Sequence, residues 1–157
     1  MDSQSQPSDT SALVSPFEKV HFYHGISSDP PELLYRSDLE TNPFVIPKAE
    51  DRHSAIPEKT IHGVFDPIFR PIWPDTLAPA ISSLLKERRI RYSTLSAVRF
   101  STPDDNLGPI VIWISVFPNS TTDIACRDVS PDIISILESH GVKGAVVQWI
   151  EGAVERL

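Results

Sequence analysis

The chain has 157 residues, of which 40% are hydrophobic and 22% charged, and this composition fits one globular domain, with or without a long arm. A formal net charge of −7 argues against binding to nucleic acid or to an anionic membrane, because both select a basic protein face. A single cysteine, Cys126, excludes an intramolecular disulfide and a cysteine-rich zinc module, and no stretch reaches the roughly 18–20 apolar residues of a membrane helix. We therefore expect an intracellular, cytoplasmic protein that does not enter membranes.

The amino-terminal half differs in composition from the rest. Residues 1–16 are rich in Ser, Asp, Gln and Pro, which predicts a disordered tail. Ten of the fifteen prolines lie in residues 1–74, yet large apolar side chains recur throughout residues 17–74. Proline interrupts helices and central strands, and a free linker would not carry so many apolar groups. We interpret 17–74 as a Pro-rich extended arm that packs on a compact domain.

Three local structures are predicted within this arm. Residues 30–35 are expected to form a short turn of helix, and residues 60–65 a short strand. Residues 66–74 contain three prolines and are expected to be extended, because the residue before a proline is pushed out of the helical region.

The compact domain is expected to span residues 75–157. Its first element is an amphipathic helix, since apolar residues recur at positions i, i+4, i+7 and i+8, namely Leu77, Ile81, Leu84 and Leu85. Pro79 is expected in the first turn of this helix, where proline is tolerated.

The strand that organises the sheet is expected at residues 110–117, where seven of eight side chains are large and apolar. A run this short is typical of a strand, and the lack of a polar alternate face indicates that both sides are covered. A strand at 94–101 should precede it through a hairpin connection at 103–108, so the two strands should be antiparallel neighbours. The last strand, at 144–151, follows a helix and should run parallel to the central strand.

Pro131 has to be accommodated in the helical region before the last strand. Ser130, Pro131 and Asp132 form a typical helix start, with a cap, a proline at the first position and an acid in the first turn. We expect a short turn at 122–128 and a main helix at 131–140. The alternative is one kinked helix.

The order helix, strand, strand, helix, strand predicts an α+β fold with a small mixed sheet, a ferredoxin-like half plait with both helices on one face. The open face of the sheet needs a cover, and the arm with Trp73 is expected to supply it. Trp113 and Trp149 are expected to be neighbours on the sheet.

No pattern in the sequence predicts a catalytic residue, a cofactor or a metal site. The six glycines form no phosphate-binding loop, and no nucleophile elbow or zinc-protease motif occurs. His21 and His24 have a spacing found in metal sites, but without a third ligand they are more simply surface histidines. Cys126 is more simply a small packing residue than a nucleophile.

The candidate binding residues are Tyr35, Arg36, Phe44 and Trp73. They combine aromatic side chains and an arginine with neighbouring prolines, in chain that is expected to be irregular. Two interpretations stay open: these residues pack the arm onto the domain, or they form a recognition surface for a partner chain.

Several short motifs are shared with a known family. They are residues 31–37, 42–44, 61–65, 91–100, 108–114 and 151–157. Through them about four fifths of the chain, from Pro30 to Leu157, resembles the amino-terminal region of a family of uncharacterised fungal proteins that is abundant in mushroom-forming species. Longer members of that family resemble fusions to a carboxyl-terminal region with trypsin-like features. This chain stops where that region would begin, so the resemblance implies a front domain alone, from a truncated gene or a fragment, and carries over no catalytic residue.

We therefore expect a non-enzymatic interaction or accessory domain, whose partner is another protein or a missing carboxyl-terminal domain. The alternative is a small hydrolase-like enzyme that uses Cys126, or a histidine with a nearby carboxylate. A third alternative is a gene remnant without activity. An enzyme should bring a nucleophile and a base within about 3 Å in a concave pocket, whereas an interaction domain should expose an apolar patch.

Overall fold

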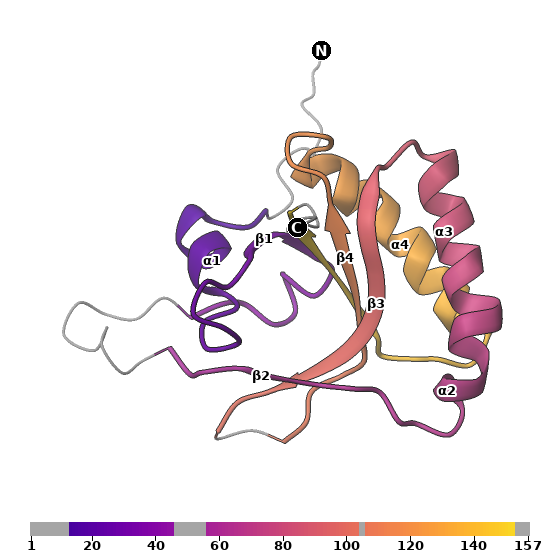
Figure 1. The fold of residues 1–157 in the computed structure, drawn as a ribbon, viewed down its shortest axis with the longest axis horizontal. Helices are drawn as coiled ribbons and strands as arrows, with labels where there is room; N and C mark the ends of the chain where they lie inside the picture. The colour runs from indigo at the N-terminus through magenta and orange to yellow at the C-terminus, as the bar shows by residue number, and fades with distance from the viewer. Residues whose placement is uncertain (1–12, 46–55, 104–105, 153–157) are drawn as a thin grey trace, which may run out of the picture.

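The computed structural model describes residues 13–45, 56–103 and 106–152, and these form an α+β fold around one mixed sheet (Figure 1). The sheet has five strands in the order β1-β5-β4-β3-β2, in which β4 and β5 run parallel and the other neighbours are antiparallel. The strands are β1 (Glu32–Arg36), β2 (Thr60–His62), β3 (Tyr92–Ser101), β4 (Val111–Val116) and β5 (Val146–Glu151). The predicted α+β class with a mixed sheet, the central place of β4 and its pairing with both neighbours are confirmed.

Helices cover both faces of the sheet. α3 (Ala78–Glu87) and α4 (Asp123–Ser139) lie on one face, and the short α1 (Pro16–His21) lies on the other (Figure 1). α2 (Phe69–Ile72) and the π-helix η3 (Trp73–Leu77) lead directly into α3. The two longer helices therefore share one face, as the sequence predicts, and Pro79 lies in the first turn of α3.

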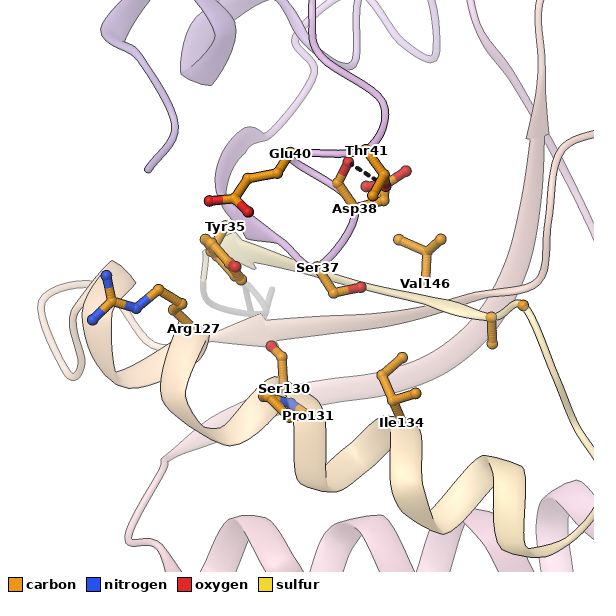
Figure 2. A pocket seen from close by; sticks show the side chains of 12 residues that line it. Tyr35, Ser37, Asp38, Glu40, Thr41, Arg127, Ser130, Pro131, Ile134 and Val146 are labelled. Atoms are coloured by element: carbon orange, nitrogen blue, oxygen red, sulfur yellow. Dashed lines mark hydrogen bonds between the residues drawn. The ribbon is translucent and has the colours of Figure 1, made fainter. Parts of the chain in front are cut away.

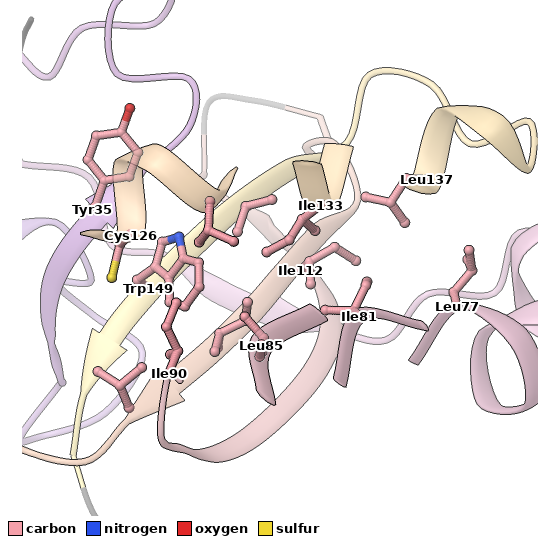
Figure 3. Packing of buried hydrophobic residues seen from close by; sticks show 14 of the residues in the cluster. Tyr35, Leu77, Ile81, Leu85, Ile90, Ile112, Cys126, Ile133, Leu137 and Trp149 are labelled. Carbon is pink, nitrogen blue, oxygen red and sulfur yellow. The ribbon is translucent and has the colours of Figure 1, made fainter. Parts of the chain in front are cut away.

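The main hydrophobic core fills the space between the sheet and the two long helices (Figure 3). Trp149 of β5 is fully buried there and pairs with Ile114 across the sheet. Trp113 precedes Ile114 on β4, and successive side chains of a strand point to opposite faces. Trp113 accordingly packs in a second cluster, with Tyr23 and Phe100. The expectation that the two tryptophans are neighbours is therefore wrong, because they lie on opposite faces.

α4 is one helix that runs through Pro131, so the alternative of a single helix holds and the predicted break is wrong. Thr122 caps it, with Thr122 Oγ1 accepting from the amide of Ala125 at 3.1 Å. A proline inside a helix costs about 3 kcal/mol or more. Ile133 and Leu137, both beyond the proline, are fully buried, and burial of each side chain contributes about 1.5–3 kcal/mol. Continuous packing on the sheet therefore outweighs the proline.

Residues 69–77 are helical, so the expectation of an extended path over 66–74 is wrong there. The carbonyl of Asp66 accepts hydrogen bonds from the amides of Phe69 and Arg70, which starts the first turn. Prolines in the opening turns of short helices sacrifice few bonds, because the first amides of a helix have no helical partner. Phe69 is buried beneath this segment and stacks on Trp73 at 5.3 Å between ring centroids.

Residues 32–36 form strand β1 where a turn of helix was expected at 30–35, and that expectation is wrong. β1 pairs with β5, whose edge would otherwise leave backbone groups unpaired. A bulge between Leu33 and Tyr35 puts Leu34 and Tyr35 both into the main core. It thereby turns Arg36 toward α1, where its side chain contacts Glu18.

The face of the sheet opposite the long helices is covered by the segment around α1 and not by Trp73. Phe22 and Tyr23, which follow α1, are buried against this face, whereas Trp73 packs beside the main core. Strands β1 and β2 precede residue 74 and belong to the same sheet as β3–β5. The ferredoxin-like half plait and the extended arm therefore stay predictions from the sequence.

Candidate functional site

The four candidate binding residues do not form one surface. Tyr35 is buried in the main core, and Trp73 packs half-buried at the edge of that core. Arg36 is fully buried on the other face of the sheet, where the half-buried Phe44 also lies. Both contact Phe22: the Arg36 guanidinium lies 4.9 Å from its ring centroid, and the Phe44 ring 6.2 Å. Only Arg36 and Phe44 are thus brought together.

Arg36 is the centre of a buried charge cluster between α1 and β1. Its Nε donates to Glu18 Oε2 at 2.5 Å, and its Nη1 donates to Asp38 Oδ1 at 3.1 Å. Arg36 exposes 0% of its surface and Glu18 4%, so each charge is compensated by the other and not by water. Nη2 of Arg36 is also buried and has no hydrogen-bond partner in the described part of the chain. The cluster ties α1 to the edge strand β1.

Lys59 contacts the same aromatic ring from the segment that precedes β2. Its Nζ lies 4.1 Å from the Phe22 ring centroid and donates to the Phe22 carbonyl at 2.6 Å. Burial, with a smaller contribution from the positive charge of Arg36, lowers the pKa of this ammonium from its ordinary value to about 8, although Glu18 opposes the shift. Lys59 is thus a half-buried amine held against the α1 segment.

A chain of hydrogen bonds crosses the sheet beside this cluster. The indole Nε1 of Trp113 donates to the Tyr23 hydroxyl at 3.0 Å, and that hydroxyl donates to Gln148 Oε1 at 2.7 Å. Burial raises the pKa of Tyr23, so its phenol stays neutral and keeps the proton that it donates. The amide of Gln148, only 5% exposed, is therefore held in one orientation, with Oε1 already used.

The larger of two neighbouring pockets has a volume of about 620 Å³ and lies between α4, the start of β5 and the turn after β1 (Figure 2). Much of its polar lining is occupied by structural bonds. Ser37 Oγ accepts from the Val147 amide, while Ser130 Oγ donates to the Cys126 carbonyl and accepts from Trp149 Nε1. These hydroxyls hold the fold together and offer little to a ligand.

The second pocket has a volume of about 420 Å³ and shares Asp38 and Val146 with the first. It lies between the α1 segment, the loop that joins β3 to β4, and Lys59. Its polar lining includes Asn42, Lys59, Ser101, Asn106 and Gln148, and its apolar lining includes Phe22, Phe100 and Val111. This pocket has a single amine, several amide and hydroxyl groups, and an apolar wall.

β2 forms one edge of the sheet, and all three of its residues are exposed. Large apolar side chains project from it and from the following segment: Ile61, Phe65 and Ile68 expose 42%, 70% and 69% of their surfaces. We call these three residues the β2 edge surface. Arg99 of β3 holds the segment in place, because its Nη2 donates to both carboxylate oxygens of Asp66 at 2.8 and 3.0 Å.

The geometry around Cys126 and the histidines does not favour the hydrolase alternative. Cys126 is fully buried, and burial raises the pKa of its thiol to about 12, so the reactive thiolate is disfavoured. His62 Nε2 lies 2.9 Å from Ser101 Oγ and 2.8 Å from Thr60 Oγ1, on the exposed surface of β2 and β3. A serine and a histidine do meet here, but the ring nitrogen is shared between two hydroxyls on an open edge.

Cys126 is expected to be unreactive in the folded protein. An aromatic disulfide reagent at neutral pH should modify it at least about a hundredfold more slowly than in the urea-unfolded chain, because the thiol is inaccessible and its pKa is raised. The release of the coloured thiolate measures both rates. Rapid modification of the folded protein would contradict the burial of this residue and reopen the nucleophile hypothesis.

Several residues of the charge cluster and the second pocket were not singled out by sequence reasoning. Glu18, Asp38, Lys59 and Gln148 lie in four separate segments, and no spacing in the sequence relates them. The one available signal was Arg36 itself, a charge directly after the apolar run 33–35. A charged residue next to an apolar run indicates that it has a buried partner, but the sequence does not identify which residue that partner is.

No protein-family model, curated protein or solved structure matches the chain. Within residues 13–45, 56–103 and 106–152, no cluster of three or more His, Cys, Asp or Glu side chains has the geometry to hold a metal ion. In the same ranges, no helix is both long and apolar enough to cross a membrane.

Proposed function

We propose that this domain acts by binding another protein, and that the β2 edge surface receives an extended segment of that partner. The observation that carries the proposal is the exposed edge strand with three large apolar side chains, Ile61, Phe65 and Ile68, on it and directly after it. An edge strand offers unpaired backbone groups for strand addition, and neighbouring side chains supply specificity.

Two further features support this surface as a binding site. The ion pair between Arg99 and Asp66 holds the segment between Phe65 and Ile68, so the surface is preorganised and less freedom is lost on binding. The guanidinium of Arg70 lies 5.5 Å from the Phe65 ring centroid, which adds a cationic rim to the apolar centre. Such a surface suits a segment that alternates apolar and acidic side chains.

We further propose a cellular compartment for the protein and a type of partner. A single cysteine fits an intracellular, cytoplasmic protein, because stable disulfides belong to oxidising compartments. The resemblance to the front region of longer fungal proteins points to one alternative occupant, a carboxyl-terminal domain of a longer chain. We favour a separate protein, and the experiment below distinguishes the two.

Selection of displayed random peptides on the immobilised domain tests this function. We expect enrichment of peptides with alternating apolar residues. Replacing both Phe65 and Ile68 with aspartate should weaken their binding by about tenfold or more, since central apolar contacts each contribute more than about 1 kcal/mol. Fluorescence anisotropy of a labelled peptide measures the affinity.

The control is Ile124→Asp, which places an aspartate on an exposed apolar residue of α4, 47% exposed, outside the β2 edge surface. This variant should bind as the parent does. Both variants should unfold within about 0.5 kcal/mol of the parent, because surface substitutions have small effects. Equal weakening by Ile124→Asp would contradict the proposal. If no peptide is enriched and this domain instead binds the carboxyl-terminal region of the longer fungal proteins that it resembles, the intramolecular occupant would be favoured.

A further inference from the structure

The second pocket leaves several polar groups available to a ligand. Gln148 has its Oε1 engaged by Tyr23, so the group that it can offer to the pocket is its Nε2 donor. Asn42 Nδ2 donates to Asp38 Oδ2 at 3.5 Å, and Asp38 also accepts from Arg36. The one carboxylate in the pocket wall is therefore already compensated. What this pocket offers is mainly hydrogen-bond donors.

Lys59 is the amine of this pocket. An ammonium carries three donors, and the structure assigns one of them to the Phe22 carbonyl. No carboxylate of residues 13–45, 56–103 and 106–152 lies within ion-pair distance of Lys59 Nζ. Burying a cation without a counter-ion is costly, so a negatively charged group bound here would gain a favourable partner.

The remaining walls specify the rest of the ligand. Phe100 and Val111 are buried and line the pocket, and the ring of Phe22 supports Lys59. An inorganic anion would leave these apolar walls uncovered. We propose that the second pocket binds a small organic carboxylate, with the carboxylate at Lys59 Nζ and Gln148 and an apolar body against Phe100 and Val111. This inference is independent of the β2 edge surface.

The proposal has a pH dependence with a definite sign. Among the described residues, the charged groups that act on Lys59 are Arg36, which lies over the same Phe22 ring, and Glu18, while Asp38 lies in the pocket wall. In the protein without ligand, Lys59 has a pKa of about 8. Below that pH the amine is already protonated, so the affinity for the carboxylate should be constant. At higher pH the site must take up a proton to bind, so affinity should fall by about tenfold per pH unit.

The test is a titration of the protein with sodium hexanoate and sodium benzoate, and with inorganic phosphate as comparator. The indole resonance of Trp113 and the Cε resonance of Lys59 report binding. We expect saturable shifts with at least one carboxylate, and an affinity at least about tenfold lower in Lys59→Met. Lys143→Met removes an exposed lysine and should leave the affinity unchanged.

Three results would overturn the proposal. They are the absence of saturation with both carboxylates, equal affinity in Lys59→Met, and binding of phosphate as tight as that of the carboxylates. If Lys59→Met does not fold, the titration of the unaltered protein between about pH 7 and pH 10 decides instead. Affinity that does not fall as Lys59, followed by its Cε resonance, loses its proton would show that Lys59 does not hold the ligand.

Discussion

Replacing Trp149 with alanine is expected to lower the free energy of unfolding by about 3–5 kcal/mol. Trp149 is the largest side chain with no exposed surface, and it lies where β5, α3 and α4 meet (Figure 3). Its Nε1 also donates to Ser130 Oγ at 2.9 Å, so truncation removes both packing and a buried hydrogen bond. Urea-induced unfolding followed by circular dichroism measures the change.

Trp149→Phe is the matched control, because it removes the indole donor but keeps an aromatic ring. It should cost about 1–3 kcal/mol, from the loss of one of the two hydrogen bonds of the buried Ser130 hydroxyl, which keeps its bond to the Cys126 carbonyl, together with a modest loss of packing. A loss below about 1 kcal/mol in Trp149→Ala would contradict the position of this residue in the core.

Replacing Arg36 with methionine is expected to cost about 3–5 kcal/mol, because it leaves the Glu18 carboxylate buried without a positive partner. The double variant Glu18→Leu with Arg36→Met should recover most of this loss, since an apolar pair replaces a buried ion pair at little net cost. The comparison of the two single variants and the double variant in urea unfolding gives the coupling energy between the residues.

The exposed ion pair between Arg88 and Asp132 supplies the control for this cycle. Its side chains expose 42% and 49% of their surfaces, so Arg88→Met should change the unfolding free energy by less than about 1 kcal/mol. If Arg36→Met were no more destabilising than Arg88→Met, the burial of the Arg36–Glu18 pair would be contradicted.

The elements that the sequence predicts correctly are those whose local pattern agrees with their tertiary setting. The apolar run at 110–117 contains β4, and the stripe from Leu77 to Leu85 contains most of α3. Both are read from periodicity, because a strand covered on both faces and a helix covered on one have different repeats. The pairing of β4 with its two neighbours follows from the lengths of the connections. The short connection from β3 allows an antiparallel hairpin, and the long helical connection to β5 allows a parallel crossover.

The errors fall where prolines or short apolar runs leave two local structures nearly equal in energy. The run 33–35 fits a turn of helix or a strand, and the free edge of β5 decides for the strand. Pro131 favours a helix start at Ser130, and the burial of Ile133 and Leu137 on the sheet decides for a continuous α4. After Asp66 the prolines favour an extended path, and the burial of Phe69 favours the helix that the structure contains.

The sequence alone therefore determined the α+β class, the central strand, the two long helices on one face and the absence of known catalytic motifs. Only the tertiary structure decided which charged side chains contact one another and where the pockets form. A bulge in β1 turns the Arg36 side chain toward α1, where it contacts Glu18 and Asp38. The segment before β2 brings Lys59 to the Phe22 ring, which Arg36 also contacts. Local patterns record the repeat of a helix or strand, but contacts between distant segments depend on how the whole chain folds back on itself, which no local spacing encodes.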